Sequence, residues 1–131
     1  MLKHIPAILT PDLLKILMEV GHGDEIVIAD GNFPAAALAQ RLVRLDRRCC
    51  VLRAVMQFFP LDAYTKEPVA LMEAVPGDPA APEPERCHFE FVERFAFYER
   101  AKRAYAVIAT GKTEIYANIL LKKGVVLPEG A

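Results

Sequence analysis

The sequence lacks a long hydrophobic run, and none of its apolar stretches approaches the ~20 residues that a membrane-spanning helix needs. It also lacks a charge imbalance, because 16 basic and 17 acidic side chains leave a formal net charge of −1. No stripe of Lys and Arg indicates a nucleic-acid surface. The first residues lead directly into a segment that looks structured, so we expect no signal peptide. We therefore expect a protein without membrane or nucleic-acid partners.

Cysteine is scarce and irregularly spaced. The three cysteines are Cys49, Cys50 and Cys87, an odd number with one adjacent pair and no C-x-x-C motif. Such a set does not make a disulfide framework and indicates reduced thiols in the cytoplasm. The cysteines and the three histidines also lack the spacing of a zinc site.

Several familiar catalytic motifs are missing as well. The chain has no P-loop, no G-x-G-x-x-G, no H-E-x-x-H and no G-x-S-x-G. These absences argue against the common nucleotide-binding, zinc-protease and serine-hydrolase sites. We expect no cofactor and no metal.

What the sequence does have is enough apolar material for one core. The chain has 131 residues, of which 53% are hydrophobic and 25% are charged. This length and composition are typical of a globular domain, so we expect residues 1–131 to form a single domain.

The first third of the chain predicts a helix followed by a buried strand. Thr10 offers a capping hydroxyl, Pro11 suits the first helical turn, and an apolar stripe with helical spacing follows. Gly21 is suited to end that helix. The apolar run at 25–29 then predicts a buried strand, and the polar segment 30–32 predicts a turn.

Helices and strands alternate along the rest of the chain. We predict helices at 35–43, 49–59 and 94–109, and strands at 68–75, 88–92 and 118–121. Gly111 is the expected end of the last helix, and the proline-rich segment 76–85 is expected to be a loop. This alternation indicates an α/β fold, a sandwich of helices packed on a mostly parallel or mixed sheet.

Polar residues gather at four of the predicted boundaries. They are His22, the turn from Asp30 to Asn32, Arg94, and the segment from Tyr116 to Asn118. Because ligands of α/β folds bind where strands end in loops, these residues are candidates for one site. Each also has a purely structural interpretation, as a turn residue, a surface charge or the edge of the core. We expect Tyr98 and Tyr105 to be packing residues.

His22 and Asp30 pose a geometric problem if they act together. A strand at 25–29 separates them by roughly 17 Å, at ~3.3 Å per residue. They share a pocket only if the chain at one end folds back, or if a neighbouring subunit brings the two ends together.

Two long stretches carry a resemblance to a known family. They are PDLLKILMEVGHGDEIVIADGNFPA, which starts at Pro11, and RFAFYERAKRAYAVIATGKTEIYANILLKKGV, residues 94–125. In order and spacing they closely resemble the sugar mutarotase family of L-fucose mutarotase and D-ribose pyranase, over nearly the whole chain. The RFAFYERA and LLKKGV segments resemble the fucose branch, whereas the ribose branch has a histidine where this chain has Arg94.

The resemblance implies roles for six residues: His22 as the proton donor, and Asp30, Arg94, Tyr116, Ala117 and Asn118 as substrate-binding residues. The implied activity is that of an isomerase, which interconverts the α and β anomers of L-fucose or a related monosaccharide by acid–base ring opening and closure. Such relatives form ring-based homo-oligomers, commonly decamers, with sites near subunit contacts. We expect the same assembly here, in the cytoplasm.

Two other functions stay open from the sequence. One is a non-catalytic monosaccharide-binding protein, and the other is a D-ribose pyranase acting on pyranose–furanose exchange. Asn32 stands where some fucose-type relatives have histidine, and the proline-rich loop is shorter than in some relatives. These departures leave the preferred sugar open.

Overall fold

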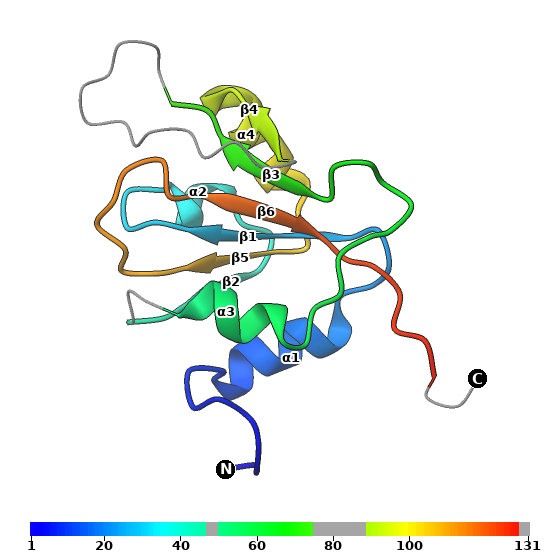
Figure 1. The fold of residues 1–131 in the computed structure, drawn as a ribbon. Coiled ribbons are helices and arrows are strands. Elements are labelled where there is room, and N and C mark those ends of the chain that lie inside the picture. Colours follow the sequence, from blue (N-terminus) through cyan, green and yellow to red (C-terminus); the bar gives the residue numbers. More distant parts are fainter. Residues whose placement is uncertain (47–49, 75–88, 129–131) are drawn as a thin grey trace.

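The computed structural model describes residues 1–46, 50–74 and 89–128 (Figure 1). The predicted loop at 76–85, as well as Cys49 and Cys87, lies outside these residues. Cys50 is a free thiol. Within the described part of the chain, no helix has the length and apolar character needed to cross a membrane.

The described strands form one mixed, six-stranded sheet in the order β2-β5-β1-β6-β3-β4. The strands are β1 (Glu25–Ala29), β2 (Leu42–Arg44), β3 (Val69–Met72), β4 (Glu90–Val92), β5 (Ala106–Ala109) and β6 (Ile119–Lys122). β6 runs antiparallel to both of its neighbours, β1 and β3, and the other pairs are parallel. The mixed sheet agrees with the predicted fold class.

Helices cover both faces of this sheet (Figure 1). α1 (Pro11–Glu19) and α3 (Val51–Met56) lie on one face, and α2 (Ala35–Leu38) and α4 (Arg94–Arg103) lie on the other. In β1, Ile26 and Ile28 pack with α1 and α3, whereas Val27 and Ala29 pack with α2 and α4. Because successive side chains of a strand point to opposite faces, β1 is apolar on both faces from Ile26 to Ala29. The predicted α/β sandwich is confirmed.

Three predicted helices were too long, and the one expected at 49–59 corresponds to α3 (Val51–Met56). The helix expected at 35–43 ends at Leu38, and residues 42–44 instead form the edge strand β2, with only Val43 buried. The helix expected at 94–109 ends at Arg103, and β5 follows it. All four residues of β5 are buried, because the strand lies between β1 and β2. Gly111 therefore follows a strand and does not end a helix.

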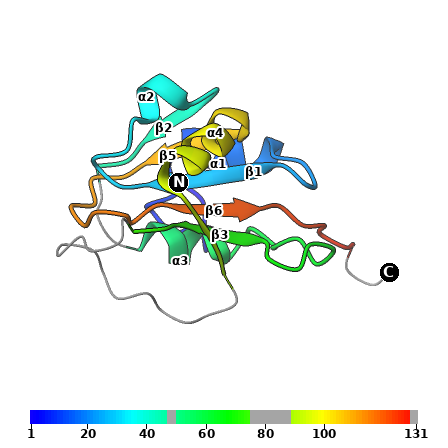
Figure 2. The same cartoon turned by 90° about the horizontal axis from the view of Figure 1, so that it is seen from above.

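Beyond the carboxyl end of β6, the chain pairs with the loop that precedes β3. Figure 2 shows the loop before β3 lying beside the segment that follows β6. A β-bridge pairs Leu61 of that loop with Lys123.

The strand predicted at 118–121 is observed one residue later, as β6 (Ile119–Lys122).

Candidate functional site

One edge of the sheet gathers most of the predicted site residues. Parallel strands bring their carboxyl ends to the same edge, and an antiparallel strand begins there. Asp30 follows β1, Arg94 follows β4, and Asn118 precedes β6. The topology thus brings together three side chains that are far apart in the sequence.

Asp30 is the fixed point of this edge. It is 3% exposed, and its carboxylate accepts hydrogen bonds from the amides of Asn32 (2.9 Å) and Ala117 (3.2 Å). Its own amide donates to Asn118 Oδ1 at 2.8 Å. Since an ionised carboxylate has about four acceptor positions, Asp30 retains capacity for ligand hydroxyl groups.

Arg94 lies at the first turn of α4, with its side chain exposed. The preceding Glu93 caps the helix by accepting from the amides of Phe95 and Ala96. Arg94 Nε donates to the Tyr98 hydroxyl at 3.0 Å, and this hydrogen bond raises the pKa of Arg94. The side chain of Arg94 is therefore exposed, but its hydrogen bond to Tyr98 holds it against α4.

Tyr116 has an unusual backbone, with φ of 58°. A bulky residue in the left-handed region is an outlier, and such strain is concentrated at ligand sites and switches. The next residue, Ala117, is held by its hydrogen bond to Asp30. The surrounding contacts thus fix the whole segment from Tyr116 to Asn118.

These residues surround a cavity of about 200 Å³ on the α2 and α4 face, which we call the edge pocket. It is lined by Asp30, Asn32, Phe33, Met72, Arg94, Tyr98, Ile115, Tyr116 and Asn118. Ala117 contributes through its amide and does not line this pocket. Charged and amide groups face aromatic and aliphatic walls here, a combination that suits a small polar ligand with one apolar face.

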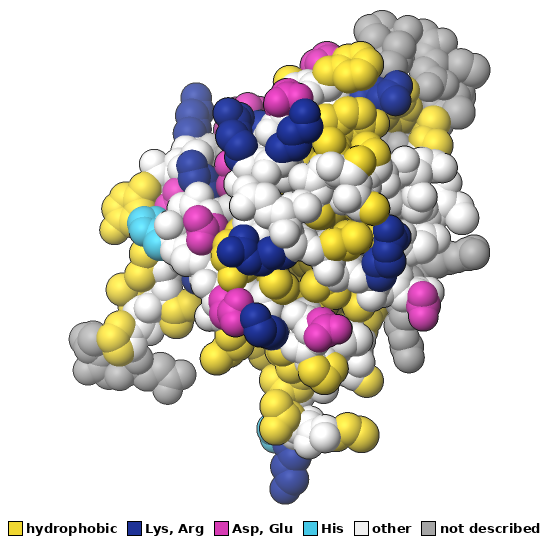
Figure 3. Space-filling model, turned by 180° about the vertical axis from the view of Figure 1, so that it is seen from behind, with side chains coloured by type: hydrophobic (Ala, Val, Ile, Leu, Met, Phe, Trp, Pro, Cys, Tyr) yellow, Lys and Arg dark blue, Asp and Glu magenta, His cyan; other side chains and the backbone are white. Residues whose placement is uncertain are grey.

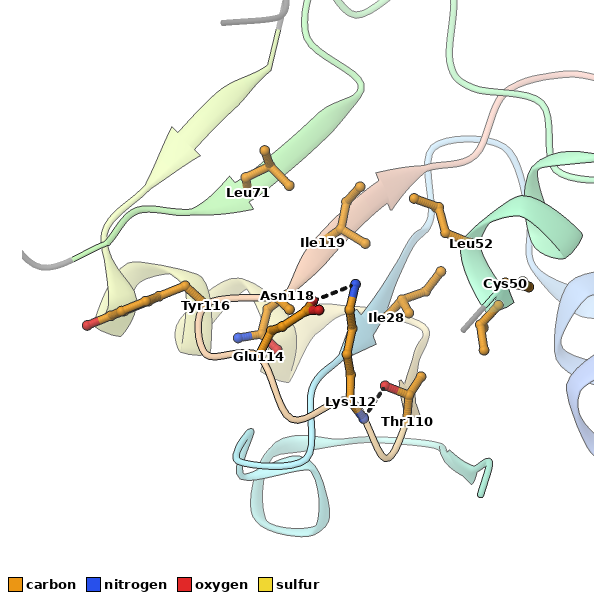
Figure 4. Close-up of a pocket in the computed structure, with 12 residues that line it drawn as sticks. Ile28, Cys50, Leu52, Leu71, Thr110, Lys112, Glu114, Tyr116, Asn118 and Ile119 are labelled. Atoms are coloured by element: carbon orange, nitrogen blue, oxygen red, sulfur yellow. Dashed lines mark hydrogen bonds and ion pairs between the residues drawn. The ribbon is translucent and has the colours of Figure 1, made fainter. Parts of the chain in front are cut away.

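A larger cavity of about 450 Å³ lies on the α3 face of the same edge (Figure 4). Ile28, Leu52 and Ile119 are among its walls, and Lys112 pairs with Glu114 across 3.0 Å. Figure 4 shows the Tyr116 ring pointing away from these apolar walls. The segment from Tyr116 to Asn118 lines this cavity too, so it lies between the larger cavity and the edge pocket.

His22 is not at this edge. It lies in a turn at residues 21–24, before β1 and therefore at the opposite end of the strand from Asp30. Its side chain is 47% exposed, its Nε2 is 3.3 Å from Asp62 Oδ1, and its ring centroid is 5.7 Å from that of Tyr64. Within one copy, the chain does not fold back to bring His22 to Asp30.

The turn of His22 depends on a glycine. Gly23 has φ of 85°, which side chains rarely adopt and which a type II turn requires at its third residue. The amide of Asp24 donates to the Gly21 carbonyl at 3.1 Å, and the Gly21 amide donates to the Asp24 carboxylate at 2.8 Å. The Gly-His-Gly sequence therefore makes a tight turn that presents the imidazole.

Two residues of these sites were missed from the sequence. Tyr98 was expected to pack in the core, but it also lines the edge pocket and accepts the hydrogen bond of Arg94. The spacing of four residues on one helix was a usable signal. Asp62 was not singled out, because nothing in the sequence links it to a histidine 40 residues earlier.

The surface charge is mixed. On the face seen in Figure 3, Lys and Arg side chains alternate with Asp and Glu and with apolar side chains. Among residues 1–46, 50–74 and 89–128, no three His, Cys, Asp or Glu side chains form a group able to hold a metal ion.

Residues 3–126 match the RbsD / FucU transport protein family. The chain belongs to this family. An L-fucose mutarotase of Histophilus somni (strain 2336) is 44% identical over 140 aligned positions, which cover 95% of this chain and 97% of the relative. The crystal structure of a fucose mutarotase from Streptococcus pneumoniae, in complex with L-fucose, has a TM-score of 0.87 and 44% identity over 96% of this chain and 100% of that one.

The ribose branch of the RbsD / FucU family is more distant. The structure of Bacillus subtilis RbsD complexed with D-ribose has a TM-score of 0.69 and 26% identity, over 97% of this chain and 100% of that one. Both comparisons extend over nearly all of each chain. The resemblance to the fucose branch is therefore confirmed.

Proposed function

We propose that this protein is a sugar mutarotase, an isomerase that interconverts the α and β anomers of L-fucose. The observation that carries the proposal is the edge pocket, which joins Asp30, Arg94 and Asn118 in a chain 44% identical to an L-fucose mutarotase. The identity to the D-ribose complex is lower, at 26%. L-Fucose is therefore favoured over D-ribose as the substrate.

The reaction needs only proton transfers. A proton reaches the ring oxygen of the sugar while another leaves the anomeric hydroxyl group, so the hemiacetal opens and recloses on either face. General acid–base catalysis contributes roughly 100- to 10,000-fold to such a step. Histidine is the side chain best suited to exchange protons near neutral pH, and we assign this role to His22.

The edge pocket supplies the binding groups. Asp30 and Asn118 are buried and fixed, so they are suited to accept and donate hydrogen bonds to sugar hydroxyl groups. Arg94 and Tyr116 shape the pocket beside them. The aromatic walls, such as Phe33 and Tyr98, are suited to the apolar face of a pyranose ring.

We propose that a second copy of the chain completes this site. His22 lies at one end of β1 and the edge pocket at the other, so the two meet only between subunits. Large apolar side chains such as Met18 (84% exposed) and Phe95 (65% exposed) are suited to a subunit interface. We propose a ring-based homo-oligomer in the cytoplasm, a decamer, whose closed symmetry repeats this contact between all neighbouring subunits.

The test is NMR exchange spectroscopy on equilibrated L-fucose, D-ribose and D-galactose, with and without the protein. We expect faster exchange between the α and β anomers of L-fucose, with less effect on the pyranose–furanose exchange of D-ribose. Binding without faster exchange of any sugar would support a monosaccharide-binding protein and reject the enzyme. The variant His22→Ala should lose roughly 100-fold or more of the enhancement while L-fucose still binds.

A further inference from the structure

Tyr64 is the most exposed aromatic side chain in the described part of the chain, at 85%. It stands in the loop of Asp62, residues 60–65, between α3 and β3. Its ring centroid lies 5.7 Å from that of the His22 imidazole, and the two rings are inclined at 52°. The aromatic side chain most open to solvent therefore lies beside the histidine of the proposed reaction.

The backbone holds Tyr64 and His22 in fixed positions relative to each other. The Tyr64 amide donates to the Asp62 carboxylate at 3.1 Å. Lys123 joins this loop to the turn of His22, because it accepts from the Gly23 amide at 2.9 Å and forms a β-bridge with the loop. Any surface that receives His22 therefore receives Tyr64 as well.

Tyr64 lies far from the edge pocket of its own copy. It precedes β3, as His22 precedes β1, and both strands run antiparallel to β6, which lies between them. The two strands therefore begin at the same edge of the sheet, and the edge pocket lies at the opposite edge. A contact between Tyr64 and a sugar in the edge pocket requires two copies of the chain.

The edge pocket of one copy is small for a complete binding site. Its volume is about 200 Å³, whereas sites for small ligands usually measure about 300–1,000 Å³ and bury most of the ligand surface. A monosaccharide held by Asp30 and Asn118 is thus only partly enclosed. A second surface is required to cover its open side.

We propose that Tyr64 of one copy is a substrate-contacting residue for the sugar bound in the next copy: its ring enters beside His22, covers the open side of the edge pocket and packs against C–H groups of the sugar. This role rests on the proposed function and on the proposed contact between copies. A tyrosine ring is rigid, so it adds apolar contact area at a low cost in conformational entropy. L-Fucose offers such a ring a methyl group on C5 that D-ribose lacks.

Two other roles of Tyr64 predict different results. Single exposed aromatic side chains also occur on protein surfaces without a function, and truncation of such a residue would leave the kinetics unchanged. A residue that only joins subunits would change the size of the oligomer and, through it, kcat. Contact with the sugar instead predicts a raised KM in an assembly of unchanged size.

The first experiment measures anomer exchange at several L-fucose concentrations, with light scattering on the same samples. We expect Tyr64→Ala to raise KM roughly 3- to 10-fold, the effect of losing one aromatic contact, with a smaller change in kcat. The rise should be smaller for D-ribose. Tyr64→Phe keeps the ring and should keep the wild-type KM. Phe58→Ala removes another exposed ring (42%) between α3 and β3, and as the matched control it should also keep the wild-type KM.

Three results would each overturn the role of the Tyr64 ring. They are a wild-type KM in Tyr64→Ala, an equal rise in Tyr64→Ala and Tyr64→Phe, and a rise confined to samples whose oligomer has dissociated. Because the side chain is exposed, we expect Tyr64→Ala to fold. If it does not fold, Tyr64→Gln takes its place, since it also removes the ring but keeps a polar side chain.

Mixed oligomers show which copy brings Tyr64 to the site. Co-expression of Tyr64→Ala with Arg94→Ala should leave about one quarter of the sites with both halves intact, so part of the activity should have the wild-type KM. Co-expression of Tyr64→Ala with His22→Ala should leave no such site, because both side chains come from the same copy. Activity with the wild-type KM in the second mixture would overturn the proposal.

The role of Tyr64 and the proposed function fail differently. A wild-type protein that does not accelerate anomer exchange refutes the proposed function, and the dissociation constant for L-fucose then replaces KM as the test of Tyr64. An active wild type whose KM is unchanged in Tyr64→Ala refutes only the role of Tyr64.

Discussion

In the edge pocket, the side chains of Asp30 and Asn118 are held mainly by hydrogen bonds to backbone amides. Asp30 accepts two amides, and its own amide needs the side chain of Asn118. A buried amide without an acceptor costs about 1–3 kcal/mol, so Asn118 stabilises the fold as well as the pocket. Binding and folding therefore share these residues, and their replacement affects both.

The stability of the protein should depend on pH through Asp62. Hydrogen bonds, first from Thr65, lower its pKa in the folded state. A carboxylate of this kind stabilises the fold fully above its unfolded pKa of ~3.9, and this contribution is lost as the pH falls through the lower, folded pKa. At pH 7, we expect Asp62→Asn to unfold at a lower urea concentration than the wild type. The difference between their unfolding midpoints should shrink below about pH 4.

Urea unfolding of both proteins between pH 7 and pH 2 measures this effect. Asp46→Asn should differ little from the wild type at each pH, because Asp46 is exposed. A difference for Asp62→Asn that stays constant down to pH 2 would contradict a lowered pKa.

The sequence predicted where several of the candidate residues lie in the fold. Asp30, Arg94 and Asn118 were placed at boundaries of predicted strands, and a sheet brings such boundaries together. Tyr98 and Asp62 depend on contacts that exist only in the folded chain. The resemblance to the family singled out His22 as a candidate, but the sequence did not indicate its contact with Asp62, which lies 40 residues further along the chain.

At the scale of elements, the sequence was misleading where short strands follow helices. The run from Ala106 to Ala109 continued the apolar pattern of α4, and alanine favours helices. Burial between β1 and β2 decides in favour of a strand, because this run has no polar face to turn to water. The start of the amphipathic α1 was predicted correctly, and the Thr10 side chain caps it by accepting from the Leu13 amide.

Gly124 packs against the loop before β3, where its amide donates to the Pro60 carbonyl at 2.8 Å. A Cβ at this position would overlap the Leu61 carbonyl group, so Gly124→Ala must push the loop of Asp62 away from β6. Overpacking of this kind costs about 1–3 kcal/mol in stability. We also expect a lower kcat for L-fucose, because Asp62 would move relative to His22.

Urea unfolding and anomer exchange together test this variant. Val125→Ala is the control, because it changes the exposed neighbour of Gly124 and should leave both quantities near wild type. Full stability and full activity of Gly124→Ala would show that the loop of Asp62 tolerates the displacement.

At the scale of the whole molecule, one copy holds two halves of the proposed site at opposite ends of β1. His22 lies before the strand, and Asp30 and the edge pocket lie after it. In the proposed assembly, the histidine end of one copy meets the pocket end of the next, and such head-to-tail contacts form a ring when the rotation between copies closes. Ring assembly would thus be a condition of activity and not only of stability.

Complementation between inactive variants tests this assembly. His22→Ala and Arg94→Ala should each be nearly inactive alone, because each lacks one half of the site. If every site takes its halves from two copies, mixed oligomers from co-expression should recover about one quarter of wild-type activity, since that fraction of sites receives both intact halves. A site contained within one copy would give no recovery, and light scattering coupled to gel filtration would reject the assembly if the protein were a monomer at micromolar concentration.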